Sequence, residues 1–232
     1  MADENPTIHV VVTKNGPYQV TGAESLVQEV IGTDAQGMSV KWIDGQTVAG
    51  KAKMFLCRCG HSANKPFCDG THLKIGFDGT ETASRESYLS QAQVFDGPVM
   101  ELTDVQALCA FARFCDPHGQ VWSQVSETDD PEIRAQFVKQ VGDCPSGRLV
   151  AWDKDTGKPV EPDLPLSIGL IEDPSQNCSG PLWLRGGISV ESSDGFTYER
   201  RNRVTLCRCG ASRNKPFCDG SHASIGFQDD IA

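Results

Sequence analysis

One sixteen-residue stretch occurs twice in this chain of 232 residues, and it constrains the fold more than any other feature. The first copy runs from Cys57 to His72 and the second from Cys207 to His222, a constant offset of 150 residues. Each copy has the spacing Cys-x-Cys-x8-Cys-x3-His. Thiolates combined with an imidazole are the ligands of iron–sulfur clusters and of zinc ions. We therefore predict that the chain folds around two equivalent metal centres.

The sequence before each copy is also similar, which predicts a repeated β-rich unit. Strands are expected at 8–13, 18–21, 38–42 (closed by Asp44-Gly45), 53–56, 166–171, 182–184 and 204–206. Gly16-Pro17 precedes the second of these strands, and Gly180-Pro181 precedes its counterpart in the later copy. The repeat therefore spans roughly 60 residues per unit.

The segment between the two copies has a more helical pattern. Thr103 and Gln106 match a capping box that would start an amphipathic helix over 105–114. A second helix is expected to begin at Asp130-Pro131, with its apolar face formed by Ile133, Phe137, Val138 and Val141. A short strand is expected at 149–152. We predict an α+β fold in three parts, a first metal unit at 1–78, an insert at 79–160 and a second metal unit at 161–232.

Both copies share the pattern Cys-x-Cys-x2-Ser-x3-Pro-x-Cys-Asp-Gly-(Ser/Thr)-His, which resembles the CDGSH, or NEET-type, iron–sulfur family. The resemblance implies one [2Fe–2S] cluster per copy, with the Cys-x-Cys pair on one iron and the third Cys and the His on the other. The ligands implied are Cys57, Cys59, Cys68 and His72, then Cys207, Cys209, Cys218 and His222. The family also implies a dimer with two neighbouring clusters. We expect a pseudo-twofold arrangement of the two units, in a monomer with an internal pseudo-dimer or in a homodimer.

The spacing and the histidine bear on the kind of centre. A Cys-x-Cys pair is tighter than the Cys-x2–4-Cys knuckle of most zinc sites, although a zinc ion that staples the loop is the alternative. An imidazole in place of a thiolate raises the reduction potential of a cluster. It also makes the centre sensitive to protons, so acid is expected to release the cluster.

Several neighbours of the ligands have expected roles. Asp69 and Asp219 are expected to cap the helical turn before each histidine. Basic residues near the ligands would tune the potential, meet an acidic partner, or simply be solvated, and they are Arg58, Lys65, Arg208, Arg213 and Lys215. His61 has no counterpart in the second copy and is expected at the surface.

The insert contains three cysteines, Cys109, Cys115 and Cys144-Pro145, in an arrangement that resembles a divergent single-cluster ferredoxin domain. Ala112 stands where such a domain has its middle cysteine. Three thiolates would hold a [3Fe–4S] cluster, or a [4Fe–4S] cluster with solvent, Asp116 or His118 as fourth ligand. The alternative is a ferredoxin-like scaffold that has lost its cluster and keeps buried thiols. Cys178 is expected in a turn and has no assigned role.

Composition limits the function. A net charge of −10 argues against nucleic acid and suits a redox or cluster-accepting protein partner. No run of 18 apolar residues exists to span a membrane. The N-terminal sequence lacks signal-peptide features, so we expect a cytoplasmic location. In that compartment the ten cysteines favour metal ligation over disulfides.

The predicted function is electron transfer, redox or pH sensing, or transfer of [2Fe–2S] clusters. No nucleophile with an adjacent base is visible, so we expect no catalytic residue and no enzyme activity. The alternatives are a structural adaptor stabilised by its clusters and a redox enzyme that uses the insert.

Overall fold

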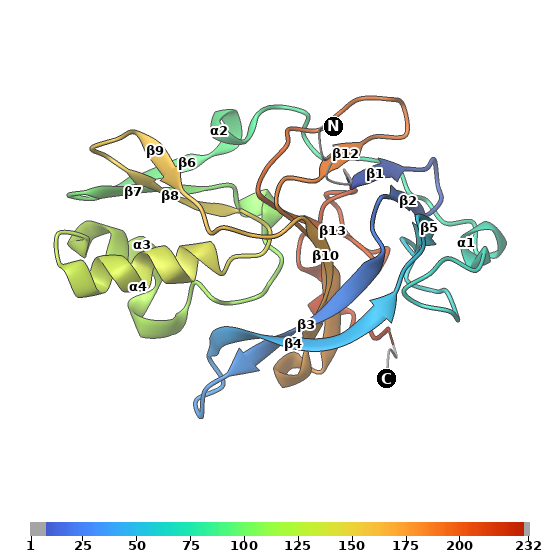
Figure 1. The fold of residues 1–232 in the computed structure, drawn as a ribbon, viewed down its shortest axis with the longest axis horizontal. Helices are drawn as coiled ribbons and strands as arrows, with labels where there is room; N and C mark the ends of the chain where they lie inside the picture. The colour runs from blue at the N-terminus through green and yellow to red at the C-terminus, as the bar shows by residue number, and fades with distance from the viewer. Residues whose placement is uncertain (1–7, 230–232) are drawn as a thin grey trace, which may run out of the picture.

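The computed structural model describes residues 8–229, which form three β-sheets and several short helices in an α+β fold (Figure 1). The first sheet has the order β12 (Ser189–Glu191), β1 (His9–Val12), β2 (Tyr18–Thr21), β5 (Lys53–Leu56). The second has the order β13 (Arg203–Leu206), β11 (Cys178–Arg185), β10 (Ser167–Asp173), β3 (Ser25–Thr33), β4 (Ser39–Ala49). The third has the order β6 (Gln93–Asp96), β7 (Met100–Asp104), β8 (Leu149–Asp153), β9 (Lys158–Val160).

The helices are short apart from one in the insert. The α-helices are α1 (Thr71–Lys74), α2 (Tyr88–Gln91), α3 (Val121–Gln124), α4 (Pro131–Gly142) and α5 (Ser221–Ser224). The 3-10 turns are η1 (Gln106–Leu108), η2 (Pro117–Gly119), η3 (Val125–Glu127) and η4 (Pro174–Gln176). None of the helices formed within residues 8–229 has the length and hydropathy needed to cross a bilayer.

Two equivalent sets of strands lead into the two cysteine-rich copies. β1, β2 and β5 are neighbours in the first sheet, and β10, β11 and β13 are neighbours in the same order in the second. Tyr18 pairs with Leu56, directly before Cys57, and Leu182 pairs with Leu206, directly before Cys207. The similar sequences that follow Gly16-Pro17 and Gly180-Pro181 therefore form equivalent strands in equivalent register.

Each of these two sheets also receives a strand from the other half of the chain. β3 leaves the first set and pairs in parallel with β10, with Val27 opposite Gly169. β12 leaves the second set and pairs in parallel with β1, with His9 opposite Ser189. One hydrophobic core contains side chains of both sheets, among them Val10, Val20, Leu170, Leu184 and Leu206. Separating the two halves would break two strand pairings and open this core.

The insert forms a separate body beside the second sheet, at the left of Figure 1. Its own core joins sheet β6–β9 to α3 and α4 and contains Leu102, Phe137, Val141 and Leu149. The insert also contacts the second sheet. There the ring of Trp42 in β4 lies 4.7 Å from the ring of Phe114 in the insert and 4.7 Å from the ring of Trp183 in β11. The insert is therefore packed on the half of the molecule that carries the second copy.

Helix α4 confirms one sequence prediction. Asp130 is its N-cap, and the Asp130 carboxylate accepts hydrogen bonds from the backbone N–H groups of Glu132 and Ile133. Pro131 occupies the first turn, and Phe137 and Val141 are fully buried.

The predicted helix over 105–114 is wrong. Thr103 lies in β7 opposite Val150, and only the three-residue turn η1 follows it. Phe111 and Arg113 have φ angles of 56° and 62°, which a right-handed helix does not allow. The strand pairing and the packing of this loop against its neighbours override its local helical pattern.

The long strands β3 and β4 also differ from expectation. β3 was outside the predicted set, and so was β12. The strand expected at 38–42 does not end at Asp44-Gly45 but continues to Ala49. The register between β3 and β4 shifts between Val27 and Glu29, so Asp44-Gly45 is absorbed by an irregularity within the hairpin rather than by a turn.

Candidate metal centres

The first cysteine-rich copy is a loop that folds back on the end of β5. The Cys57 N–H donates to Pro66 O (2.8 Å) and the Cys68 N–H donates to Phe55 O (2.8 Å), which holds the third cysteine beside the first. The Cys57 and Cys59 Sγ atoms are 3.8 Å apart. Cys68 Sγ lies 3.3 Å from His72 Nδ1, across the left-handed turn at Gly70 that leads into α1.

The second copy repeats this arrangement at the end of β13. The Cys207 N–H donates to Pro216 O (2.9 Å) and the Cys218 N–H donates to Thr205 O (3.0 Å). The Cys207 and Cys209 Sγ atoms are 3.6 Å apart. Cys218 Sγ lies 3.4 Å from His222 Nδ1. Both copies thus present their donors as two pairs, Cys with Cys and Cys with His.

Short polar contacts fix each loop. The Ser62 hydroxyl donates to Phe67 O (2.6 Å) and accepts from the Asn64 N–H (3.0 Å). The Asp69 carboxylate accepts from the N–H groups of Ala63 and Thr71, and these bonds hold the pKa of Asp69 well below its usual range. Asp219 accepts from Arg213 and Ser221 in the same way.

The helix caps themselves differ from prediction. Gly70, with φ 86°, is the N-cap residue of α1, and Gly220, with φ 85°, is that of α5. Asp69 and Asp219 precede these positions, so they brace the loop from outside the helix rather than cap it. Glycine is needed here because this φ is costly for a residue with a Cβ atom.

The donors converge as pairs rather than as larger groups. Among residues 8–229, no three His, Cys, Asp or Glu side chains lie close enough together to hold a single ion. Backbone N–H groups support the sulfur atoms, since the Gly70 N–H lies 3.4 Å from Cys68 Sγ and the Gly220 N–H lies 3.4 Å from Cys218 Sγ. Such donors stabilise thiolates that bind metal.

Burial affects the protonation of the metal-free donors. It raises the pKa of the Cys59 thiol to about 11 and raises that of Cys218 well above its ordinary value. Metal binding would therefore displace protons from these thiols. Burial, together with the nearby Arg208 charge, lowers the pKa of His222 to about 4, which keeps its imidazole neutral as metal ligation requires.

The two copies pack directly against each other. A Cβ atom added at Gly60 would lie 2.4 Å from Cys209 O, and one added at Gly210 would lie 2.5 Å from Cys59 O. The buried Tyr18 hydroxyl of β2, a strand that leads toward the first copy, also contacts the second copy, because it donates to Cys207 O (2.7 Å) and Pro216 O (3.0 Å). The two Cys-x-Cys segments of one chain are therefore in reciprocal backbone contact.

The arginines within the Cys-Arg-Cys segments are buried, so of the roles expected for them the simply solvated charge is wrong. Arg58 donates to Gly79 O (2.6 Å), and its guanidinium stacks near the rings of Tyr18 and Phe77. Arg208 makes ion pairs with Glu172 and Asp229. The repeated Ile-Gly-Phe tail after each histidine was the available signal, since it supplies the ring beside each guanidinium.

The surroundings of the two Cys–His pairs differ. Cys68 and His72 are partly exposed, and Leu73 next to them is 78% exposed. Cys218 and His222 are only 3% and 4% exposed. Gly220 lies against the insert, where an added Cβ would meet Phe111 Cβ at 3.3 Å and Cys109 O at 3.4 Å. The insert loop thus covers the second pair and leaves the first uncovered.

The three insert cysteines line one cavity. Its wall contains Cys109, Cys115 and Cys144 together with Ala112 and Arg148. Of the two side chains considered as a fourth ligand, Asp116 lies 3.8 Å from Cys115 Sγ, whereas His118 lines a different cavity. The three predicted thiols therefore line the same cavity, although Cys109 does not lie on the helix predicted for it.

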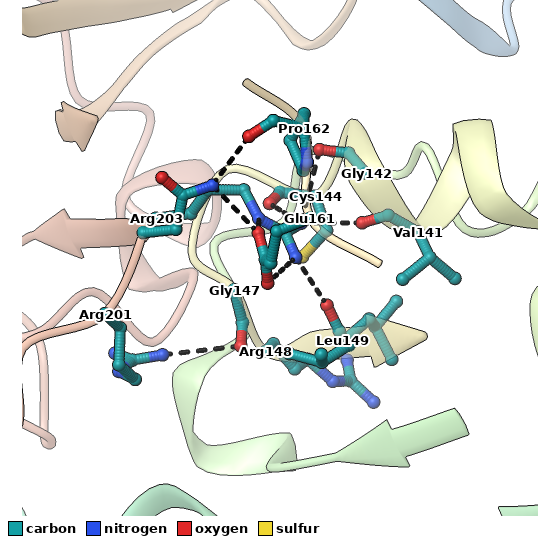
Figure 2. A network of polar contacts seen from close by, with 12 residues as sticks. Val141, Gly142, Cys144, Gly147, Arg148, Leu149, Glu161, Pro162, Arg201 and Arg203 are labelled. Carbon is teal, nitrogen blue, oxygen red and sulfur yellow. Dashed lines mark hydrogen bonds and ion pairs between the residues drawn. The ribbon is translucent and has the colours of Figure 1, made fainter. Parts of the chain in front are cut away.

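An arginine of β13 shapes the loop that carries Cys144. Figure 2 shows the Arg203 guanidinium among backbone carbonyls of this loop and the carboxylate of Glu161. Its side chain is 0% exposed. It donates to the carbonyl oxygens of Val141, Gly142, Cys144 and Leu149. Arg201 contacts the same loop, because its guanidinium donates to Ser146 O and Gly147 O.

Two residues outside the centres complete the comparison with the sequence. Cys178 is not in a turn but begins β11, where it is buried. His61 is exposed, as predicted.

Comparison with protein families agrees with the motifs. The family described as iron-binding zinc finger, CDGSH type, matches residues 15–73 and 179–223. The family described as divergent 4Fe-4S mono-cluster matches residues 95–154. No curated protein and no solved structure matches the chain. The chain therefore carries two iron-binding domains of the CDGSH family with a divergent iron–sulfur domain between them.

Proposed function

We propose that each CDGSH copy holds one [2Fe–2S] cluster and that the protein is a one-electron carrier. The observation that carries this proposal is the pairing of the donors in each copy. Cys57 and Cys59 would bind one iron, and Cys68 with His72 Nδ1 would bind the other. In the second copy the corresponding pairs are Cys207 with Cys209 and Cys218 with His222.

The donor arrangement supports a binuclear cluster over a zinc ion. A structural zinc site gathers four ligands around one tetrahedral ion. Here each copy offers two separated pairs, which suits two metal atoms with two protein ligands each. The iron-binding description of the matching family supports the same assignment. When bound, such a cluster supplies reversible one-electron chemistry, and its imidazole ligand raises its potential above that of an all-cysteine cluster.

The contact between the copies supports an internal pair of clusters. Gly60 against Cys209 and Gly210 against Cys59 are reciprocal contacts, as a pseudo-twofold relation of the two units would produce. The exchange of β3 and β12 between sheets has the same reciprocity. We propose that one chain provides the neighbouring cluster pair and exchanges electrons with a redox protein. Delivery of a cluster to an acceptor protein is a second role, which the partly exposed Cys68 and His72 of the first copy would allow.

The insert supports a second candidate, a third iron–sulfur centre. Cys109, Cys115 and Cys144 line one cavity, and the matching family is described as a 4Fe-4S mono-cluster domain. Ala112 leaves the set one cysteine short. Iron per chain decides this point, because two [2Fe–2S] clusters contribute about four irons and a third centre would add three or four more.

Reversible reduction tests the proposed carrier role. The protein, purified with its clusters, is mixed with a flavin-dependent ferredoxin reductase and its reduced nicotinamide, and visible absorbance is followed. We expect bleaching on reduction and full recovery on addition of a one-electron acceptor. Bound clusters that resist reduction would instead identify a structural role for the centres.

A further inference from the structure

We propose that the two CDGSH centres have different reduction potentials, the higher one belonging to the centre at Cys57–His72. The first electron added to the chain then resides on that centre. We call this the first centre, and the one at Cys207–His222 the second centre. This inference rests on the proposed function, because it concerns the relative potentials of the two proposed [2Fe–2S] clusters. It arises from differences around two otherwise identical ligand sets.

The charges at the buried arginines differ between the halves. Residue 79 is glycine and residue 229, at the 150-residue offset, is aspartate. Arg58 therefore meets the Gly79 carbonyl, whereas Arg208 meets the carboxylate of Asp229. Arg208 also donates to the Glu172 carboxylate at 2.6 Å. The buried arginine of the second half therefore pairs with two carboxylates, whereas the buried arginine of the first half bonds a carbonyl oxygen.

Among residues 8–229, no carboxylate forms an ion pair with Arg58. Asp78 is nearby in sequence, but it is exposed and hydrogen-bonds the N–H and hydroxyl of Thr80. The Arg58 guanidinium lies over the ring of Tyr18, whose hydroxyl donates to Cys207 O, so its charge acts toward both centres. The carboxylates of Glu172 and Asp229 lie on the second centre's side and produce the difference.

Burial acts in the same direction as charge. Reduction adds one negative charge to a cluster, and a buried negative charge costs more than one near water. His222 and Cys218 are almost fully buried, while His72 and Cys68 reach solvent. Net local charge and solvent exposure are two of the factors that set cluster potentials. Both lower the potential of the second centre relative to the first.

The difference in reduction potential sets the direction of electron transfer between the two clusters. An electron delivered to the second centre by a one-electron reductant would move to the first, oxidising the second cluster and reducing the first by one electron. The receiving centre is the one whose Cys–His pair is exposed to solvent. The donating centre is the one against the insert cysteines, through the contact of Gly220 with Cys109 O. Electrons would therefore accumulate on the accessible side of the molecule.

A redox titration of the full chain at pH 8, followed by visible absorbance and electron paramagnetic resonance, tests the inference. We expect two separate one-electron reduction steps, which appear as two waves at different potentials in the titration. His72→Cys and His222→Cys assign them, because replacing the imidazole by a thiolate lowers the potential of the altered centre. We expect His72→Cys to move the higher wave and His222→Cys to move the lower one.

Two charge variants then test the cause. Asp229→Asn should raise the lower wave and narrow the gap between waves. Gly79→Asp places a carboxylate beside Arg58 and should lower the higher potential, with the Arg58 guanidinium and the Phe77 ring shifting to admit the added Cβ. Asp155→Asn, an exposed residue in the turn before β9, changes the net charge equally and should move neither.

The outcomes separate this inference from the proposed function. Two bound and reducible clusters at one potential, or a higher potential at the second centre, would overturn the inference alone. An unchanged gap in both Asp229→Asn and Gly79→Asp would overturn its electrostatic basis. Absence of bound iron–sulfur clusters in the wild-type chain would overturn the proposed function and this inference together.

Discussion

The two halves of this molecule use the same sixteen-residue motif in different surroundings. Lys53 and Arg203 are equivalent residues, opposite Thr21 in β2 and opposite Arg185 in β11. Lys53 is exposed, whereas Arg203 is buried under the insert and bonded to four of its carbonyls. The motif fixes which donor atoms the fold brings together in pairs. The residues outside it decide how buried, how charged and how accessible each centre is.

Arg203 and Lys53 should show the largest difference between the halves. Arg203→Met leaves the Glu161 carboxylate without its ion pair and several buried carbonyls without their donor, so the free energy of unfolding should fall by about 3–5 kcal/mol. Lys53→Met alters an exposed side chain and should change it by less than about 0.5 kcal/mol. Urea unfolding of both variants measures this, and similar losses would show that the insert does not depend on Arg203.

Two glycines of the first motif lie in different surroundings. Gly60 packs against the second motif, whereas within residues 8–229 nothing packs against Gly70. Both have φ angles above 80°, so alanine at either position costs about 1–2 kcal/mol in backbone strain. Gly60→Ala also forces a Cβ into Cys209 O, which should add about 1–3 kcal/mol. Nothing lies within 4 Å of a Cβ at Gly70.

Gly210→Ala is the matched control for this contact, because it meets Cys59 O in the same way. Thermal unfolding should rank Gly60→Ala and Gly210→Ala together and below Gly70→Ala. Equal stability of all three variants would mean that the two motifs do not pack against each other in solution.

Glu172 has no counterpart beside Arg58 and should give the second half a pH dependence of its own. Burial raises the pKa of Glu172 to about 6 despite the opposing effect of Arg208. The folded chain therefore holds this proton more tightly than the unfolded chain. The resulting stabilisation is present below the ordinary pKa near 4.5 and is lost as the pH rises through about 6.

Glu172→Gln removes this titration. Between pH 4.5 and 7 the free energy of unfolding of the wild type should fall relative to that of the variant by about 1–2 kcal/mol. Denaturant unfolding at a series of pH values measures the difference. A difference that stays constant over this range would show that folding does not raise the pKa of Glu172.

Local sequence was sufficient to predict the paired donors and much of the secondary structure. The motif spacing predicted the donors that the structure brings together in pairs, and Asp130-Pro131 predicted the start of α4. These features depend on residues within a few positions of one another. The same is true of the strands that lead into Cys57 and Cys207.

Long-range contacts account for what local sequence did not predict. The exchange of β3 and β12 pairs residues more than 100 positions apart, and no local pattern specifies such a partner. The loop at Phe111 packs against Gly220 instead of forming the predicted helix. The difference between Gly79 and Asp229 is visible in the sequence, but its meaning depends on Arg58 and Arg208 being buried.

The count of iron and acid-labile sulfide per chain tests the central claim most directly. Two double variants, Cys57→Ser with Cys59→Ser and Cys207→Ser with Cys209→Ser, each remove the donors of one iron. Each should lose about two irons and two sulfides relative to the wild type, whatever the insert holds. Cys178→Ser, at a buried thiol outside both centres, should keep the full count. Loss of one metal per double variant, or zinc without sulfide in the wild type, would contradict the assignment of two [2Fe–2S] centres.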